Sequence, residues 1–246
     1  VEMYGMGVAV GDWNNDGFPD LLVTCVGQNR LFRNTGKGGF VDVTRRGALA
    51  PRKAFTTSGV WDDIDRAGLL DLFVCNYVRW SADADVFCSL DGKNKSYCTP
   101  EAYRGTTSWL FRNNGNGTFT DITAKSGVFD TSSKALGVAM LDFDQDGWPD
   151  LFVANDTQPN KLYRNQRNGT FAEVAVKAGL AFSADGKARA GMGVDAADLD
   201  GNGRPSVAVT NFDNEMVGLY RPSAPGAYDD AAVRAGIGAP SRNTLG

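Results

Sequence analysis

Two short segments of the chain carry acidic side chains at a spacing that suits a hard cation. They read DWNNDGFPD from Asp12 and DFDQDGWPD from Asp142, here called loop one and loop three, and both fit D-x-[DN]-x-D-G-x-x-D. Calcium takes about six to eight oxygen ligands, and side chains at positions 1, 3, 5 and 9 can supply them from one side of a turn. The glycine at position 6 permits the turn, and position 7 can add its backbone carbonyl.

This spacing predicts a ligand set in each of the two loops. The predicted ligands are Asp12, Asn14, Asp16, the Phe18 carbonyl and Asp20 in loop one, and Asp142, Asp144, Asp146, the Trp148 carbonyl and Asp150 in loop three. Because ligand charge and number tune calcium affinity, we expect loop three, with four carboxylates, to bind best and loop one to follow.

Two related loops are weaker versions of the same pattern. Loop two offers Asp63, Asp65 and Asp71 but has Ala67 at position 5. Loop four offers Asp198, Asp200 and Asn202 but has Ser206 at position 9. We expect these loops to bind calcium weakly or not at all. The sequence therefore predicts two calcium sites, in loops one and three, and at most four if loops two and four also bind.

The same residues fit two other interpretations. An EF-hand begins with the same residues but requires a glutamate at position 12 and flanking helices. Position 12 is a valine inside an apolar run in all four loops, namely Val23, Val74, Val153 and Val209. Solvated Asp/Asn/Gly turns are the simpler alternative. Two complete loops at equivalent places in a repeat favour calcium.

The loops are embedded in a sequence repeat. Their first aspartates, Asp12, Asp63, Asp142 and Asp198, are 51, 79 and 56 residues apart. Each loop is followed by a stretch like NRLFRN and then by one like GTFTDIT. The short apolar runs between turn residues predict four strands in each unit, and repeated four-stranded antiparallel units are typical of β-propeller blades.

The repeat also predicts how the chain is organised. We expect an all-β segment of about four blades from a larger ring, although closed four-bladed propellers exist. The predicted repeats cover 1–49, 50–127, 128–180 and 181–237, with a further repeat starting at 238–246 and a non-repeating insertion at 79–105. The chain starts at Val1 without a methionine, so we expect a processed or excised piece. Open blade edges would permit self-assembly.

Composition excludes several classes of function. The chain has no histidine, which excludes Ser-His-Asp and Cys-His nucleophile sites and histidine-ligated zinc. The net charge of −4 argues against nucleic-acid binding. No apolar run approaches the length of a membrane span.

The four cysteines fall into two pairs. Cys88 and Cys98 lie in the polar insertion, and we expect a disulfide there if the compartment is oxidising. Cys25 and Cys75 lie in equivalent strands but point to opposite faces. They could meet between neighbouring blades, but buried unpaired thiols are the favoured interpretation.

The repeat resembles the FG-GAP/VCBS proteins, whose blades are similar to those of the integrin α-subunit propeller. The strings N-x-L-[FY]-R-N and G-x-F-x-[DE]-[VI], and the insertion with NYVRWSADADVFC and YCTPEAYRG, resemble the branch of cartilage acidic protein and ASPIC/UnbV-type proteins. This resemblance implies a ring of about seven blades, calcium between the first two strands of a blade, and a secreted, extracellular or periplasmic location. It also implies adhesion or protein binding.

Two other functions remain open. Trp13, Phe18, Phe143 and Trp148 in the loops could face a glycan, which would make the chain a lectin-like module, although such residues more often pack between blades. A calcium-dependent polysaccharide-active enzyme is the least favoured, because paired carboxylates such as Asp62 and Asp63 belong to a repeat and a catalytic pair would be unique. We therefore expect no catalytic site, and only the insertion could hold a unique one. The partner is expected to be a protein or a glycan.

Overall fold

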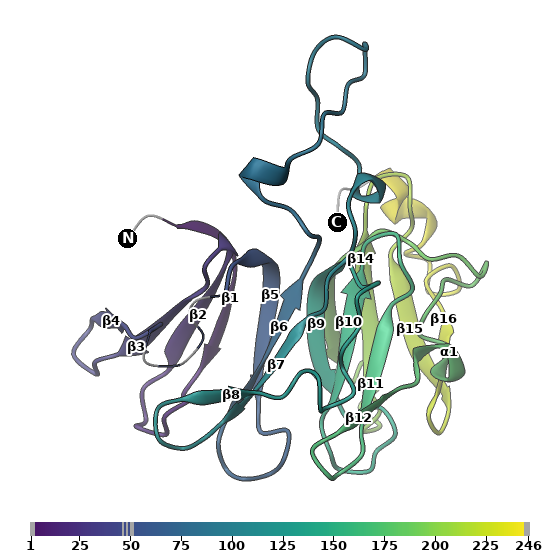
Figure 1. Cartoon of the computed structure of the whole chain (residues 1–246). Helices are drawn as coiled ribbons and strands as arrows, with labels where there is room; N and C mark the ends of the chain where they lie inside the picture. The colour runs from purple at the N-terminus through teal and green to yellow at the C-terminus, as the bar shows by residue number, and fades with distance from the viewer. Residues whose placement is uncertain (1–2, 46, 48, 50–51, 244–246) are drawn as a thin grey trace.

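A computed structural model describes residues 3–45, 47, 49 and 52–243 of the chain. The described residues form four successive antiparallel units of four strands, which stand side by side as blades (Figure 1). Blade one contains β1 (Tyr4–Gly11), β2 (Asp20–Gly27), β3 (Arg30–Asn34) and β4 (Phe40–Asp42), and blade two contains β5 (Ala54–Asp62), β6 (Asp71–Asn76), β7 (Trp109–Asn113) and β8 (Phe119–Asp121). Blade three contains β9 (Ala135–Leu141), β10 (Asp150–Asn155), β11 (Lys161–Asn165) and β12 (Phe171–Glu173), and blade four contains β13 (Gly191–Ala197), β14 (Ser206–Asn211), β15 (Gly218–Ala224) and β16 (Ala227–Asp230).

The strands follow the sequence pattern closely. The second strands of blades two and three are buried at every residue, as their continuous apolar runs indicate. Blades one and two share one eight-stranded sheet, because the end of β2 also pairs with the start of β5 at Val26–Phe55 and Gly27–Ala54. The predicted fold class, an all-β segment of a propeller built from four-stranded antiparallel blades, is confirmed.

The apolar core lies between neighbouring blades. Three clusters of buried side chains join blades one and two, two and three, and three and four, around residues such as Leu22, Phe73 and Phe152. The first strands approach one another closely, and this requires glycine. A Cβ atom on Gly7 would lie 2.5 Å from the carbonyl oxygen of Thr57 in the next blade, and one on Gly137 would lie 2.6 Å from that of Met192.

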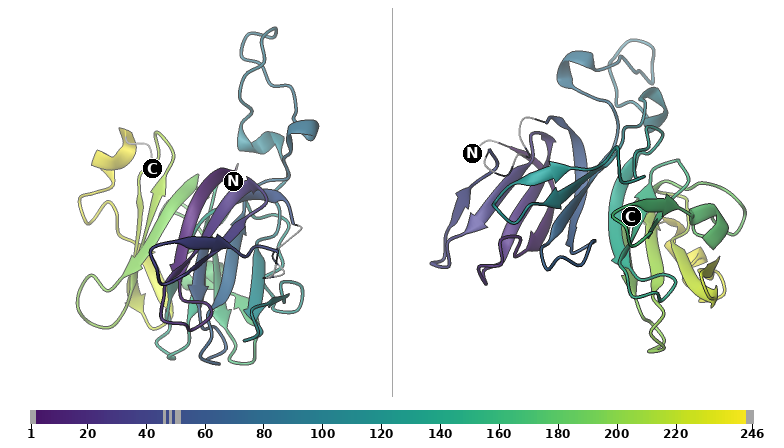
Figure 2. Two further views of the ribbon diagram at one scale, coloured as in Figure 1. Left: turned by 90° about the vertical axis from the view of Figure 1, so that its left-hand side faces the viewer. Right: turned by 60° about the horizontal axis from the view of Figure 1, so that its bottom comes forward.

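The insertion stands out from the end of the blades opposite the four acidic loops (Figures 1 and 2). It contains two short 3₁₀ turns, η1 (Ala82–Ala84) and η2 (Pro100–Ala102). Backbone bridges pair Cys88 with Ser96 and Val78 with Gly105. The predicted disulfide between Cys88 and Cys98 is confirmed, with the two Cα atoms 5.2 Å apart.

The remaining elements are short. They are α1 (Ala175–Ala178) and η3 (Ala239–Asn243). Cys25 and Cys75 are both buried and free, which agrees with the interpretation that the sequence favours. Within the described residues, no helix is long and apolar enough to cross a membrane.

Candidate metal-binding loops

All four acidic loops have the same backbone shape. Position 4 is left-handed in each, with φ of 55° at Asn15, 57° at Arg66, 59° at Gln145 and 66° at Gly201. Position 6 is a glycine with positive φ in each loop, for example 86° at Gly17. The three non-glycine residues at position 4 accept a conformation that L-residues rarely adopt, so the turn geometry is imposed by the loop as a whole.

The aspartate at position 1 holds this shape. In loop three, the Asp142 carboxylate accepts the backbone N–H groups of Asp146 at 3.0 Å and Gly147 at 2.8 Å. The first aspartates of the other loops accept the equivalent two amides. In loop three, the turn that they stabilise brings Asp144 and Asp146, at positions 3 and 5, close to Asp142 at position 1.

Carboxylates converge in two of the four loops. In loop three, oxygen atoms of Asp142, Asp144 and Asp146 all lie within 4.8 Å of one another. In loop two, Asp63, Asp65 and Asp71 do the same, although the sequence predicted a weak site there. Among the described residues, loops one and four form no such group of three acidic side chains.

Two oxygen atoms of the converging carboxylates are buried without a hydrogen-bond partner. They are Oδ2 of Asp71, a residue only 2% exposed, and Oδ1 of Asp144. A buried carboxylate oxygen without a hydrogen bond is costly, and a cation removes that cost. The donor sets of loops two and three therefore fit a hard, oxygen-preferring ion such as calcium.

In loop one, the expected ligands are engaged with each other. Asn14 donates its side-chain amide to Asp20 at 3.2 Å, and its carbonyl oxygen accepts the backbone N–H of Asp16 at 2.9 Å. Phe18, at position 7, is 44% exposed. Asp20, the third carboxylate of the loop, is therefore already hydrogen-bonded to a neighbouring predicted ligand.

The aspartate at position 9 has a structural role that the sequence analysis missed. Its Oδ1 accepts the backbone N–H of the asparagine that ends the third strand, at 2.7 Å in the pairs Asp20–Asn34, Asp71–Asn113 and Asp150–Asn165. Burial raises the pKa of Asp71 and of Asp150 to about 7 and also raises that of Asp20. The sequence signal for this role is that the aspartate at position 9 and the asparagine that ends the third strand occur together in the same three blades.

Arginine side chains form ion pairs with predicted ligand carboxylates of loops three and four. Arg164 pairs with Asp144 at 2.7 Å, and Arg167 pairs with Asp146 at 2.7 Å. Although burial opposes ionisation of Asp146, its contacts with Arg167 hold its pKa below the usual value. In loop four, Arg221 binds both oxygens of Asp200. No ion pair involves a loop-two aspartate among the described residues, so loop two offers its carboxylates without a competing cation.

The residue at position 4 links each of the first three loops to the loop of the next blade. Asn15 donates to the Gly68 carbonyl at 2.8 Å, and Gln145 donates to the Gly203 carbonyl at 3.2 Å. The Arg66 guanidinium lies 4.8 Å from the centre of the Trp148 ring. Side-chain contacts therefore connect loop one to two, two to three and three to four along one end of the blades.

The aromatic residues of the loops mostly pack inside the molecule. Trp13 and Phe143 are buried, Trp148 lies under Arg66, and the Trp13 ring is 5.5 Å from that of Phe119 in blade two. As expected for residues between blades, they do not form one exposed aromatic surface.

The fold and its repeated loops define a segment of a β-propeller with acidic turns between the first two strands of each blade. Residues 12–74, 83–153 and 142–209 match the FG-GAP-like repeat family, and the chain belongs to that family. The predicted family is therefore confirmed.

The relatives found in two further comparisons are longer than this chain. Cartilage acidic protein 1 of Homo sapiens is 28% identical over 165 residues, which are 65% of this chain and 22% of the relative. The Mus musculus protein of the same name is 37% identical over 83 residues, 34% of this chain and 11% of the relative. A solved structure on recognition of non-reducing terminal N-acetylglucosamine by an Agrocybe aegerita lectin has 17% identity and a TM-score of 0.38, covering 93% of this chain and 66% of the other.

Proposed function

We propose that this chain is part of a secreted, calcium-binding β-propeller that serves adhesion or protein–protein binding. The observation that carries the proposal is the convergence of Asp63, Asp65 and Asp71, one of which has a buried oxygen without a hydrogen-bond partner. The same arrangement recurs one blade later in Asp142, Asp144 and Asp146. A binding role fits better than a catalytic one, because these carboxylates belong to a structural repeat.

The loops give calcium a structural role. Like charges a few ångströms apart repel one another and destabilise the folded loop. A bound calcium ion supplies positive charge and oxygen coordination at this point. Since the unfolded chain does not hold the carboxylates together, the binding free energy adds to folding stability. Because side chains connect neighbouring loops, an ion bound in one loop would also stabilise the loop of the next blade.

The disulfide supports a location outside the cytoplasm. Disulfides persist in oxidising compartments, and Cys88–Cys98 closes the tip of the insertion. Extracellular calcium modules commonly have dissociation constants of about 10⁻⁴–10⁻³ M, which match millimolar calcium outside cells.

Thermal unfolding of the metal-free protein, with and without 2 mM calcium chloride (about twice the weakest such constant), tests the calcium proposal. We expect the melting temperature to rise with calcium and the rise to shrink in Asp65→Asn and in Asp144→Asn. Asp229→Asn, an exposed aspartate on β16 outside the loops, is the matched control and should respond like the wild type. Equal melting temperatures with and without calcium would contradict the proposed calcium binding.

A further inference from the structure

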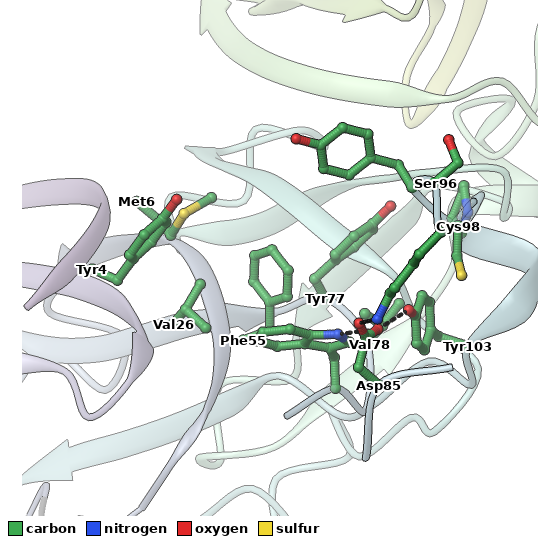
Figure 3. A pocket seen from close by; sticks show the side chains of 14 residues that line it. Tyr4, Met6, Val26, Phe55, Tyr77, Val78, Asp85, Ser96, Cys98 and Tyr103 are labelled. Carbon is green, nitrogen blue, oxygen red and sulfur yellow. Dashed lines mark hydrogen bonds and ion pairs between the residues drawn. The ribbon is translucent and has the colours of Figure 1, made fainter. Parts of the chain in front are cut away.

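A cavity of about 840 Å³ lies where the insertion meets blades one and two (Figure 3). β1 and β5 contribute Tyr4 and Phe55, and the insertion contributes Trp80, Asp85 and Lys95. The acidic loops are at the other end of the blades, so this cavity is separate from the candidate metal sites. Only blade two has an insertion, so the cavity has no counterpart in the other described blades.

Aromatic rings form the walls of the cavity. The rings of Phe55 and Tyr77 are 5.3 Å apart at 79°, and those of Phe55 and Trp80 are 6.2 Å apart at 65°. Because these rings meet edge to face, a ring face and a ring edge lie next to each other in the wall of the cavity. Tyr103 and the fully exposed Tyr97 add further rings. Faces of such rings attract cations, and ammonium groups in particular.

One carboxylate is fixed within these walls. Oδ1 of Asp85 accepts the Trp80 indole N–H at 2.9 Å and the Tyr103 hydroxyl at 2.7 Å. The Oδ2 atom accepts the Lys95 ammonium. The Trp80 and Tyr103 donors thus orient the carboxylate, and its second oxygen, Oδ2, is the one that binds a cation.

The cation now bound there belongs to the chain itself. Lys95 lies on the hairpin closed by the Cys88–Cys98 disulfide, and its side chain is 52% exposed. Ion pairs this exposed contribute little net stability, because water solvates both partners when they separate. The cavity is also far larger than one lysine side chain needs. Lys95 is therefore a replaceable occupant that shows which chemistry the site accepts.

We propose that the cavity binds an alkylammonium group, the side chain of a lysine on a partner protein, which replaces Lys95 at Asp85. The aliphatic stem would lie along Phe55, Val78 and Trp80, and the ammonium group would meet the carboxylate and the ring faces. Lys95 then acts as an internal competitor that lowers the affinity for the partner. The inference rests on the protein-binding part of the proposed function but not on calcium.

Titration of the intact chain with Nα-acetyl-lysine N-methylamide, followed by NMR in calcium-containing buffer, tests this assignment. The Nε-acetylated form of the same compound is the uncharged control probe. We expect Lys95→Met to tighten binding about fivefold, because the internal competitor is gone, and Asp85→Asn to weaken it about tenfold. Lys93→Met is the matched control, since Lys93 lies on the same hairpin and gives only its backbone amide, to Asp91.

Three results would overturn the proposal. They are equal binding of the acetylated probe, weaker binding by Lys95→Met, and binding of chitotriose in place of both lysine probes, which would assign the cavity to saccharides. Lys95→Met changes a half-exposed side chain and should fold normally. The calcium-dependent rise in melting temperature is measured on the same variants. This rise should be unchanged in Lys95→Met, Asp85→Asn and Lys93→Met. The experiment therefore distinguishes failure of the amine site from failure of the calcium proposal.

Discussion

Tyr228 makes in blade four the hydrogen bonds that Asn165 makes in blade three. The Asn165 amide donates to the carbonyls of Ile64, in the preceding loop, and Pro149, in its own loop, at 2.8 and 3.2 Å. Asn113 bonds the two equivalent carbonyls one blade earlier. In blade four, the Tyr228 hydroxyl lies 3.4 Å from the Phe143 carbonyl and 3.0 Å from that of Pro205, which are the equivalent two atoms.

The sequence of blade four explains this exchange. Pro222 replaces the asparagine, so the strand has neither the amide side chain nor a backbone N–H at that position. Ser206 replaces the aspartate that accepts this N–H in the other blades, and its hydroxyl is buried without a partner. A tyrosine in place of the usual phenylalanine of the G-x-F stretch then supplies the donor from the fourth strand.

Removal of the Tyr228 hydroxyl should destabilise the chain. Tyr228→Phe keeps the ring but removes the single hydroxyl donor that the two carbonyls share, and we expect a loss of about 0.5–1.5 kcal/mol in the free energy of unfolding. Urea unfolding in the presence of calcium measures this loss. Tyr4→Phe, at a tyrosine that is 73% exposed, is the control and should change little. Equal effects of the two substitutions would contradict the assigned role.

The bonds between blades should make Asn165 more important than its equivalent in blade one. The Asn34 side-chain NH2 donates to the Pro19 carbonyl of its own loop, at 3.0 Å, whereas the Asn165 side-chain NH2 also donates to a carbonyl of the preceding blade. We expect Asn165→Ala to cost about 1–3 kcal/mol, because it leaves buried carbonyls unpaired, and Asn34→Ala to cost clearly less. Urea unfolding of both variants compares them directly, and a larger loss at Asn34 would refute the interblade explanation.

Arg167 should compete with calcium in loop three. Its guanidinium is half-exposed and pairs with Asp146, which is a predicted ligand. Replacing it with glutamine removes a positive charge beside the site, and we expect calcium affinity to rise about three- to tenfold. Calorimetric titration measures the affinity. Arg112→Gln, at an exposed arginine with no ion pair among the described residues, is the control, and unchanged affinity in Arg167→Gln would show that the pair does not compete.

The stability of the metal-free protein should depend on pH through Asp71 and Asp150. Burial raises the pKa of each to about 7. The unfolded value is about 3.9, so between about pH 4 and 7 the folded chain binds more protons than the unfolded chain. The contribution of Asp71 and Asp150 to the free energy of unfolding should therefore increase as the pH falls from about 7 toward 4.

Calcium must displace these protons, so its apparent affinity should weaken below about pH 7. Urea unfolding at pH 5, 6 and 8, after removal of metal on a chelating resin, measures the slope. Asp71→Asn should reduce the slope, and the double variant with Asp150→Asn should reduce it further. A wild-type slope in the double variant would assign the pH dependence to other groups.

Local patterns in the sequence were enough for the blade and its turns. Alternation and short apolar runs predict strands such as β6 and β10, and the D-x-[DN]-x-D-G spacing predicts a loop whose shape depends on hydrogen bonds within five residues, as at Asp142 and Gly147. The Cys88–Cys98 pair is also local, ten residues apart. Each of these features is decided by neighbours along the chain, so residue types and spacing alone determine it.

Only the tertiary structure decided which groups meet across blades. Asn165 and Ile64 are 101 residues apart, and Tyr228 and Phe143 are 85 apart. Loop two brings three carboxylates together although its sequence matches the pattern less completely, and the carboxylates of loop three pair with Arg164 and Arg167. The aromatic cavity joins β1, β5 and the insertion. Such contacts depend on how blades pack and where side chains turn, and no spacing within one repeat contains that information.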